Sequence, residues 1–224
     1  MGQRPRRAPR RDIGGVPCRA DGRRRERAGP GSRRGFARLS RGEGAELILK
    51  GELVTLRPLT RAALPAIAEI LAEPGAARWW GRYDVARLER EYFEDDSRER
   101  AFVIELDAGD PVGLVQYWEE EEPEYRHAGM DIAIAAEQRG RGVGLDALRT
   151  LGRHLIDERG HWRLTIDPDS ENARAIRAFE KLGFRPVGVM RRYERRPDGT
   201  FRDALLMDVL AEELSGASAA ERGG

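Results

Sequence analysis

The sequence predicts an α/β fold of the mixed, α+β type, built on one mixed β-sheet. Segments with alternating apolar residues are interleaved with segments of helical periodicity, in the order β-α-α-β-β-β-α-β-α-β-β. The 224 residues include 40% hydrophobic residues, enough for one core of ordinary size. A glycine-rich turn joins a strand directly to a helix in the second half of the chain. These three observations favour a single enzyme-sized domain, which we place at residues 48–214.

The first half of this domain is expected to hold a strand, two helices and three strands. They cover residues 48–56, 61–72, 84–93, 101–106, 112–117 and 128–135. Asp84 has the side chain of an N-cap for the second helix. The sequence Ala-Gly-Asp-Pro at 108–111 predicts a hairpin between the strands that flank it.

The second half is expected to continue with a helix, a strand, a second helix and a final hairpin of two strands. Leucines recur at helical spacing over residues 145–158, and a strand follows at 163–167. A helix over 172–182 ends at Gly183, because glycine readily takes the backbone conformation that follows a helix. Strands at 187–193 and 201–210 pair across Pro-Asp-Gly at 197–199.

The two ends of the chain differ from the domain in composition. Residues 1–48 contain 14 arginines and five acidic residues, whereas the rest of the chain has 26 basic and 34 acidic residues. Residues 1–47 show no apolar period, so we expect a disordered Arg/Gly-rich tail. Such a tail could be a nucleic-acid-binding arm, a transit peptide or the product of a misassigned start codon. Residues 215–224 are expected to be a second disordered tail.

Cysteine usage and hydropathy favour a cytoplasmic protein. Cys18 is the single cysteine, so an internal disulfide is excluded. No apolar run approaches the length of a membrane span, and the composition gives no reason to expect a metal. The oligomeric state is expected to be a monomer or a homodimer.

The glycine-rich turn predicts a phosphate site. Gln138 is followed by Arg-Gly-Arg-Gly-Val-Gly, and a helical pattern begins directly afterwards. Glycines let a ligand approach the backbone, the helix N-terminus offers N–H groups, and the arginines add positive charge. The residues expected to bind a pyrophosphate are Arg139, Gly140, Arg141, Gly142, Val143 and Gly144.

Two sequence blocks resemble the GNAT superfamily of N-acetyltransferases over roughly residues 50–214. The loop at 139–144 is similar to the family's pyrophosphate loop, and Asn-Ala-Arg-Ala-Ile-Arg-Ala-Phe-Glu-Lys-Leu-Gly-Phe at 172–184 is similar to its following helix. The resemblance implies the GNAT acyl-CoA N-acyltransferase fold, with acetyl-CoA as co-substrate. It also implies cofactor contacts from Asn172 and Phe179, and an oxyanion donor among Ile134, Ala135 and Ala136.

Asp131 is the first candidate for a catalytic base. Met130, Ile132 and Ile134 are expected on one face of their strand, which leaves Asp131 on the other beside small residues. From parity alone, an aspartate that binds a neighbouring loop is an equal alternative. The strand, the acidic segments around it and Trp-Trp-Gly at 79–81 resemble the aminoglycoside 6′-N-acetyltransferases, in which the strand aspartate is implicated as the base.

Several acidic and aromatic residues are candidates for substrate binding. The acidic run Glu119–Glu122 and the negative net charge of the domain would attract a polycationic amine. Acidic runs are, however, also common in solvated loops. The tryptophans could form a platform for a sugar or pack in the core. His127 is an alternative base. The expected substrate-binding residues are Trp79, Trp80, Glu119, Glu120, Glu121, Glu122, Asp131 and Asp167.

One position departs from the family pattern. Phe179 stands where many family members have a tyrosine that protonates the leaving thiolate. Water or another group such as Tyr193 would have to take this role, which therefore stays unassigned.

The sequence thus predicts transfer of an acetyl group from acetyl-CoA to a primary amine by direct attack on the thioester. The expected acceptor is the 6′-amine of an aminoglycoside. Alternatives are a siderophore-type hydroxylysine acyltransferase, a protein N-terminal acetyltransferase, and a CoA-binding regulatory module without turnover.

Overall fold

The computed structural model describes residues 47–94, 99–107, 109–196 and 198–214. The expected tails, 1–47 and 215–224, lie outside the described residues apart from Leu47. In the described part, eight strands form one sheet in the order β1-β2-β3-β4-β5-β6-β8-β7. The strands are β1 (Leu49–Lys50), β2 (Thr55–Pro58), β3 (Arg100–Glu105), β4 (Pro111–Glu120), β5 (His127–Ile134), β6 (Arg163–Ile166), β7 (Arg185–Arg195) and β8 (Phe201–Leu210).

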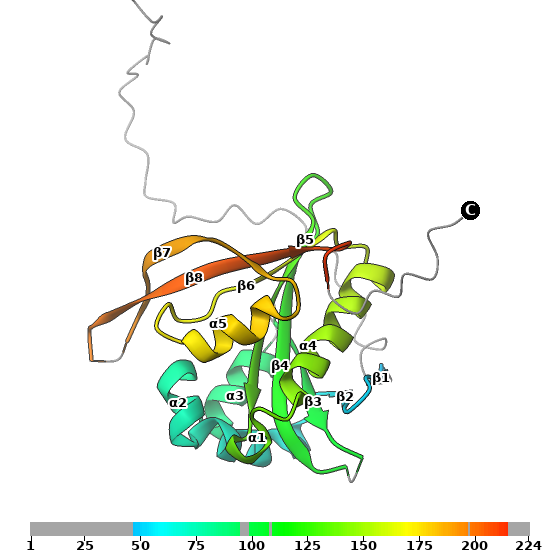
Figure 1. Cartoon of the computed structure of the whole chain (residues 1–224). Coiled ribbons are helices and arrows are strands. Elements are labelled where there is room, and N and C mark those ends of the chain that lie inside the picture. Colours follow the sequence, from blue (N-terminus) through cyan, green and yellow to red (C-terminus); the bar gives the residue numbers. More distant parts are fainter. Residues whose placement is uncertain (1–46, 95–98, 108, 197, 215–224) are drawn as a thin grey trace, which may run out of the picture. The chain divides into compact units, whose positions relative to one another are not determined.

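Along the chain the helices come between strands, and in space they lie against the sheet (Figure 1). They are η1 (Arg61–Ala63), α1 (Leu64–Ala72), α2 (Pro74–Trp80), α3 (Val85–Phe93), η2 (Ala136–Gln138), α4 (Val143–Arg153), the π-helix η3 (His154–Glu158) and α5 (Ala173–Glu180). The expected cap is present, because the Asp84 carboxylate accepts from the Arg87 N–H at 2.7 Å. None of the helices in these ranges is long and apolar enough to cross a membrane.

Two expectations for the first part of the domain are wrong. The expected strand over 48–56 is a hairpin of β1 and β2, because the chain turns at Gly51, whose N–H donates to Val54 O. The buried Asp146 carboxylate holds this turn by accepting from Leu53 N–H and Val54 N–H, at 2.7 and 3.1 Å. The second difference is α2, a helix that was not expected, in which Pro74 occupies the first turn.

The two faces of the central strands pack against different helices. Leu114 and Ala133 belong to the core beneath α1 and α3, whereas Val115 and Met130 belong to the core beneath α4. This confirms the expected alternation along β5. Asp131 therefore lies on the α1–α3 face of the sheet.

The sheet separates between β5 and β6. All neighbouring strands are antiparallel except these two, which are parallel and pair only at Ala128↔Leu164 and Gly129↔Thr165. Beyond these pairs β5 continues to Ile134 without β6 beside it, and α5 follows the end of β6 (Figure 1). One edge of β5 is thus open beside the glycine-rich loop.

Candidate active site

The glycine-rich loop forms the N-terminus of α4. Gly140 and Gly142 have φ angles of 85° and 89°, and Gly142 is the N-cap residue of the helix. L-residues rarely take this left-handed conformation, so these two glycines are required by the backbone. The first four N–H groups of a helix have no partner within it and carry its positive end. The loop can therefore hold an anion such as a pyrophosphate.

The side chain of Arg139 has partners within the protein. Its Nε donates to Ile134 O at 2.8 Å, and its Nη2 lies 3.2 Å from a Glu73 carboxylate oxygen. The guanidinium thus joins the end of α1 to the end of β5. Arg141 is exposed. Arg174, at the start of α5, reaches the loop. A β-carbon at position 140, which is glycine, would lie 3.7 Å from Arg174 Nη2.

The open edge of β5 presents backbone groups of Ile132 and Ile134. Ala135 N–H donates to Val112 O on β4, and consecutive residues of a strand point their polar groups to opposite sides. Ile134 and Ile132 therefore turn theirs toward the gap. The carbonyls agree, because Ile132 O accepts from Trp80 Nε1 at 3.3 Å and Ile134 O from Arg139.

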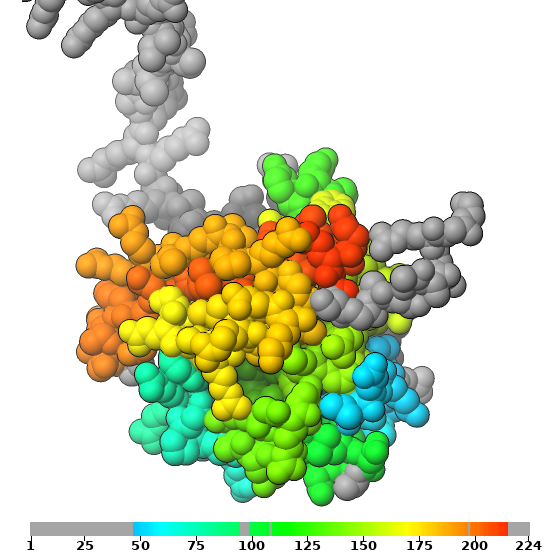
Figure 2. Space-filling view, in the orientation of Figure 1, coloured from blue at the N-terminus to red at the C-terminus, as the bar shows by residue number. Residues whose placement is uncertain are grey.

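This geometry narrows the expected oxyanion donor to one residue. Of the three expected positions, Ala135 donates its N–H to β4 and Ala136 donates to Glu73 Oε2 at 2.7 Å. Only the Ile134 N–H, among these three, faces the gap. Figure 2 shows the surface hollowed between α5, α2 and the segment before α4, where this gap opens.

Asp131 lies three residues before this donor, opposite Gln116 on β4. Gln116 Nε2 lies 3.4 Å from Asp131 Oδ2. Burial, and then the nearby carboxylate of Asp167, raise the pKa of Asp131 to about 8, although the Gln116 hydrogen bond lowers it. A carboxyl group with such a pKa is suited to accept a proton near neutral pH.

Asp167 and Tyr193 lie beside Asp131. Burial raises the pKa of Asp167, and its carboxylate accepts a hydrogen bond from the Tyr193 hydroxyl. Tyr193 is 56% exposed. The structure thus brings two expected site carboxylates together, with the tyrosine named as an alternative proton donor.

The expected acidic docking run is partly neutralised by the protein itself. Glu119 lies 2.8 Å from His161 Nε2 and 3.1 Å from Arg159 Nε. Burial alone would raise the pKa of Glu119, but the hydrogen bonds from His161 and Arg159 outweigh it and lower the pKa to about 2. Glu121 also lies near Arg159, at 3.4 Å. Glu119 is on the α4 face, opposite to Asp131, so it does not share a surface with the candidate base.

Glu120 and Glu122 have different contacts from those of Glu119 and Glu121. Glu120 accepts from the N–H of Glu122 at 3.0 Å, and Glu122 is exposed. Glu120 pairs with His127, on the same face as Asp131. His127 Nδ1 lies 2.6 Å from Tyr125 O, and its ring meets that of Trp118 edge-on.

The tryptophans, Asn172 and Phe179, all expected at the site, contact other residues of the protein. Trp80 binds the β5 edge and meets the Tyr83 ring edge-on at 5.9 Å, and Trp79 stacks with the Arg78 guanidinium. Asn172 Oδ1 caps α5 by accepting from Ala175 N–H. Phe179 is buried against Phe184. Trp80 packs partly buried against the core beneath α1 and α3.

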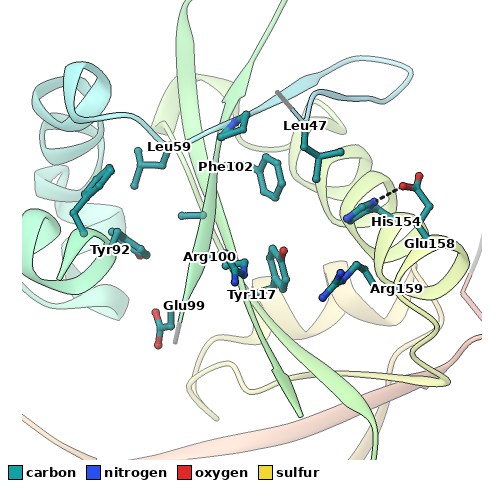
Figure 3. Close-up of a pocket in the computed structure, with 13 residues that line it drawn as sticks. Leu47, Leu59, Tyr92, Glu99, Arg100, Phe102, Tyr117, His154, Glu158 and Arg159 are labelled. Atoms are coloured by element: carbon teal, nitrogen blue, oxygen red, sulfur yellow. Dashed lines mark ion pairs between the residues drawn. The ribbon is translucent and has the colours of Figure 1, made fainter. Parts of the chain in front are cut away.

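A cavity of about 500 Å³ lies at the start of β3, between α3 and η3 (Figure 3). Aromatic residues of both faces line it, among them Tyr92 and Tyr117, together with Glu99 and His154. The Tyr92 hydroxyl also bonds to Gln116 Oε1, so this wall of the cavity is joined to the Asp131 side chain through Gln116.

The groups beside the glycine loop suit a thioester that carries a pyrophosphate. Two glycines with left-handed backbones, the N-terminus of α4 and Arg174 suit the phosphates, and the open edge of β5 suits the acyl end. Within the described residues, His, Cys, Asp and Glu form no group of three that could hold a metal ion. The fold and this site define an acyltransferase that uses a coenzyme A thioester.

Comparison with known proteins identifies the family. The acetyltransferase (GNAT) domain matches residues 54–185, and the chain belongs to this family of acetyl-CoA-dependent N-acetyltransferases. The aminoglycoside N(6′)-acetyltransferase type 1 of Klebsiella pneumoniae is 31% identical over 164 residues, 65% of this chain and 79% of that protein. The spermidine N(1)-acetyltransferase of Escherichia coli (strain K12) is 28% identical over 166 residues, 71% and 87% of the two chains.

Solved structures agree with this membership. The aminoglycoside acetyltransferase AAC(6′)-Ib in complex with coenzyme A and kanamycin matches with a TM-score of 0.60 and 28% identity, over 71% of this chain and 96% of that one.

Sequence reasoning missed four residues of the site. Gln116, Tyr92, Arg174 and Glu73 all act across long separations in the chain. Gln116 carried one usable signal: it is the polar residue in an otherwise apolar strand, Val112 to Tyr117.

Proposed function

We propose that this chain acetylates a primary amine of a polycationic small molecule, with the 6′-amine of an aminoglycoside as the leading acceptor. The observation that carries the proposal is the pair Asp131 and Asp167 beside the open edge of β5. Two carboxylates, one of them with a pKa near 8, suit an acceptor with a reacting amine and a second cationic group. The aminoglycoside acetyltransferases among the relatives support this choice.

The proposed reaction is direct attack of the amine on the thioester carbon. Asp131 takes the amine proton, directly or through water, and the Ile134 N–H donates to the developing oxyanion. A protonated alkyl amine has a pKa of about 10.4, so a carboxylate with a pKa of about 8 is a far better proton acceptor than an ordinary aspartate at about 3.9. The group that protonates the leaving thiolate stays unassigned, because the Tyr193 hydroxyl donates its proton to Asp167 and its pKa is raised by burial and by this bond.

A polyamine is the second candidate acceptor. The spermidine acetyltransferase covers a larger share of both chains than the aminoglycoside enzyme does, at slightly lower identity. Both acceptors are polycations, so the acidic site alone does not choose between them.

Thiol release from acetyl-CoA with a panel of amines tests the proposal. We expect turnover with kanamycin, and loss of turnover with an aminoglycoside that carries a hydroxyl in place of the 6′-amine. The acetylated nitrogen is identified by NMR of the product. A kcat/KM for spermidine above that of every aminoglycoside would overturn the leading acceptor, and no turnover with any amine would overturn the proposed activity.

A further inference from the structure

A hydrogen-bonded series of three side chains ends at Asp131. The Tyr92 hydroxyl of α3 lies against Gln116 Oε1 on β4, and Gln116 Nε2 lies 3.4 Å from Asp131 Oδ2 on β5. Gln116 is 8% exposed and pairs directly with Asp131 in the β4–β5 ladder. The side chain between the tyrosine and the carboxylate is thus both buried and fixed at each end.

The chemistry of the amide gives this series a direction. A glutamine side chain has one accepting oxygen and one donating nitrogen. Burial raises the pKa of Tyr92, so its hydroxyl stays protonated and donates to the oxygen. The nitrogen must then point to Asp131, where its N–H stabilises the ionised carboxylate.

The other groups around Asp131 act mostly against ionisation. Asp167 and Glu99 add negative charge and raise its pKa, as burial does, whereas Arg202 of β8 lowers it. The hydroxyls of Tyr92 and Tyr193 are the other titratable groups that sense this carboxylate. Gln116 is the neutral donor in direct contact with the carboxylate, so it can favour the ionised form without adding a charge that would repel a cationic substrate.

We propose that Gln116, oriented by Tyr92, is a positioning residue that holds Asp131 as an ionised proton acceptor in one orientation. The proposal rests on the proposed role of Asp131 as the base. It adds two residues to the machinery and predicts that they act on the pH dependence of the reaction rather than on acetyl-CoA binding.

The test is the pH profile of kcat/KM for the full-length chain and its Gln116→Met variant. Methionine keeps the length of the side chain and removes the donor. The acidic limb should move to higher pH by about one unit, because a hydrogen bond to a charged group is lost. kcat/KM at pH 7 should fall about tenfold and recover above the shifted limb. The KM for acetyl-CoA should stay unchanged.

Two tyrosine variants complete the test. Tyr92→Phe should move the limb in the same direction by less, because Gln116 keeps its donor but loses the group that orients it. Tyr83→Phe is the matched control, since the Tyr83 hydroxyl bonds to Glu91 at 2.8 Å instead and its removal should leave the limb in place. A limb that does not move in Gln116→Met, or an equal loss of rate at every pH, would show that Gln116 only packs.

A titration without substrate separates this proposal from the proposed function. The Asp131 carboxyl carbon can be followed by ¹³C NMR, with its signal assigned by comparison with Asp131→Asn. Its pKa should rise in Gln116→Met even if no tested amine is turned over. An unchanged titration would overturn the proposal, and Tyr92→Phe provides the same readout if Gln116→Met does not fold.

Discussion

Glu119 and Asp131 are buried or half-buried carboxylates on the same pair of strands, yet their pKa values move in opposite directions. Glu119 faces α4 and η3, where His161 and Arg159 bond to it, and its pKa falls to about 2. Asp131 faces α1–α3, where its direct partner is the neutral Gln116, and its pKa rises to about 8. Burial acts in the same direction on both. The partners therefore decide which carboxylate is a structural ion pair and which is poised to move protons.

The largest expected effect comes from Asp131→Asn. The amide keeps the shape and loses the base, so kcat should fall by roughly 10²- to 10⁴-fold, while acetyl-CoA affinity stays close to normal. In the native enzyme activity should be lost as the pH falls through about 8, and this limb should vanish in the variant. Steady-state kinetics across pH provide the measurement.

The same variant should gain stability at alkaline pH. A carboxyl group with a raised pKa costs stability progressively as the pH rises from the unfolded-state pKa, about 3.9, to about 8, and the full cost remains above pH 8; an amide avoids it. Asp208→Asn, a substitution elsewhere on the sheet, is the control and should keep its kcat. If Asp131→Asn keeps its kcat and only the amine KM rises, Asp131 is a docking charge, and His127 becomes the leading base.

Glu119→Gln should have the opposite effects to Asp131→Asn: it should lower the stability of the fold and leave kcat intact. The lowered pKa of Glu119 stabilises the fold above the ordinary glutamate pKa, and this contribution disappears as the pH falls through about 2. We expect a loss of about 2 to 3 kcal/mol at pH 7, measured by urea unfolding.

Glu121→Gln is the matched control for Glu119. It removes a weaker and more exposed partner of Arg159, so its cost should stay below about 1 kcal/mol. A large drop in kcat for Glu119→Gln with normal stability would contradict the structural role of Glu119.

A change in the glycine loop should affect neither carboxylate. Asparagine tolerates the left-handed backbone of residue 142, but Gly142→Asn places a side chain where phosphate must approach. Acetyl-CoA affinity should fall by about tenfold in calorimetry, the effect of one lost hydrogen bond to a charged group. Gly199→Asn, with a similar φ in the turn before β8, is the control and should bind acetyl-CoA normally. Unchanged affinity in Gly142→Asn would remove the loop from the cofactor site.

The smallest effect is expected from removing residues 1–46. Leu47 packs partly buried against the main core, so a chain beginning there keeps its first core contact. Turnover, melting temperature and both pH profiles should match those of the full chain. A loss of turnover would make the arginine-rich segment part of the enzyme and would shift the proposed domain boundary.

The sequence by itself determined the features that depend on local periodicity. The alternation of β5, the cap at Asp84 and the helix after the glycine loop each follow from residues a few positions apart. The order of the elements was predicted except for the β1–β2 hairpin and α2. The hairpin could not be foreseen, because its turn is held by Asp146, more than 90 residues away.

Only the tertiary structure decided which charged and polar groups are free to act. Arg139 was expected at phosphate, but it is paired with Glu73, 66 residues away; Glu119 was expected at substrate, but it is paired with Arg159, 40 residues away. Asp131 obtains its raised pKa from burial and from Asp167, the residue directly after β6. The physical reason is that local sequence fixes the face on which a side chain lies, whereas its charge state depends on the partners that the fold brings to that face.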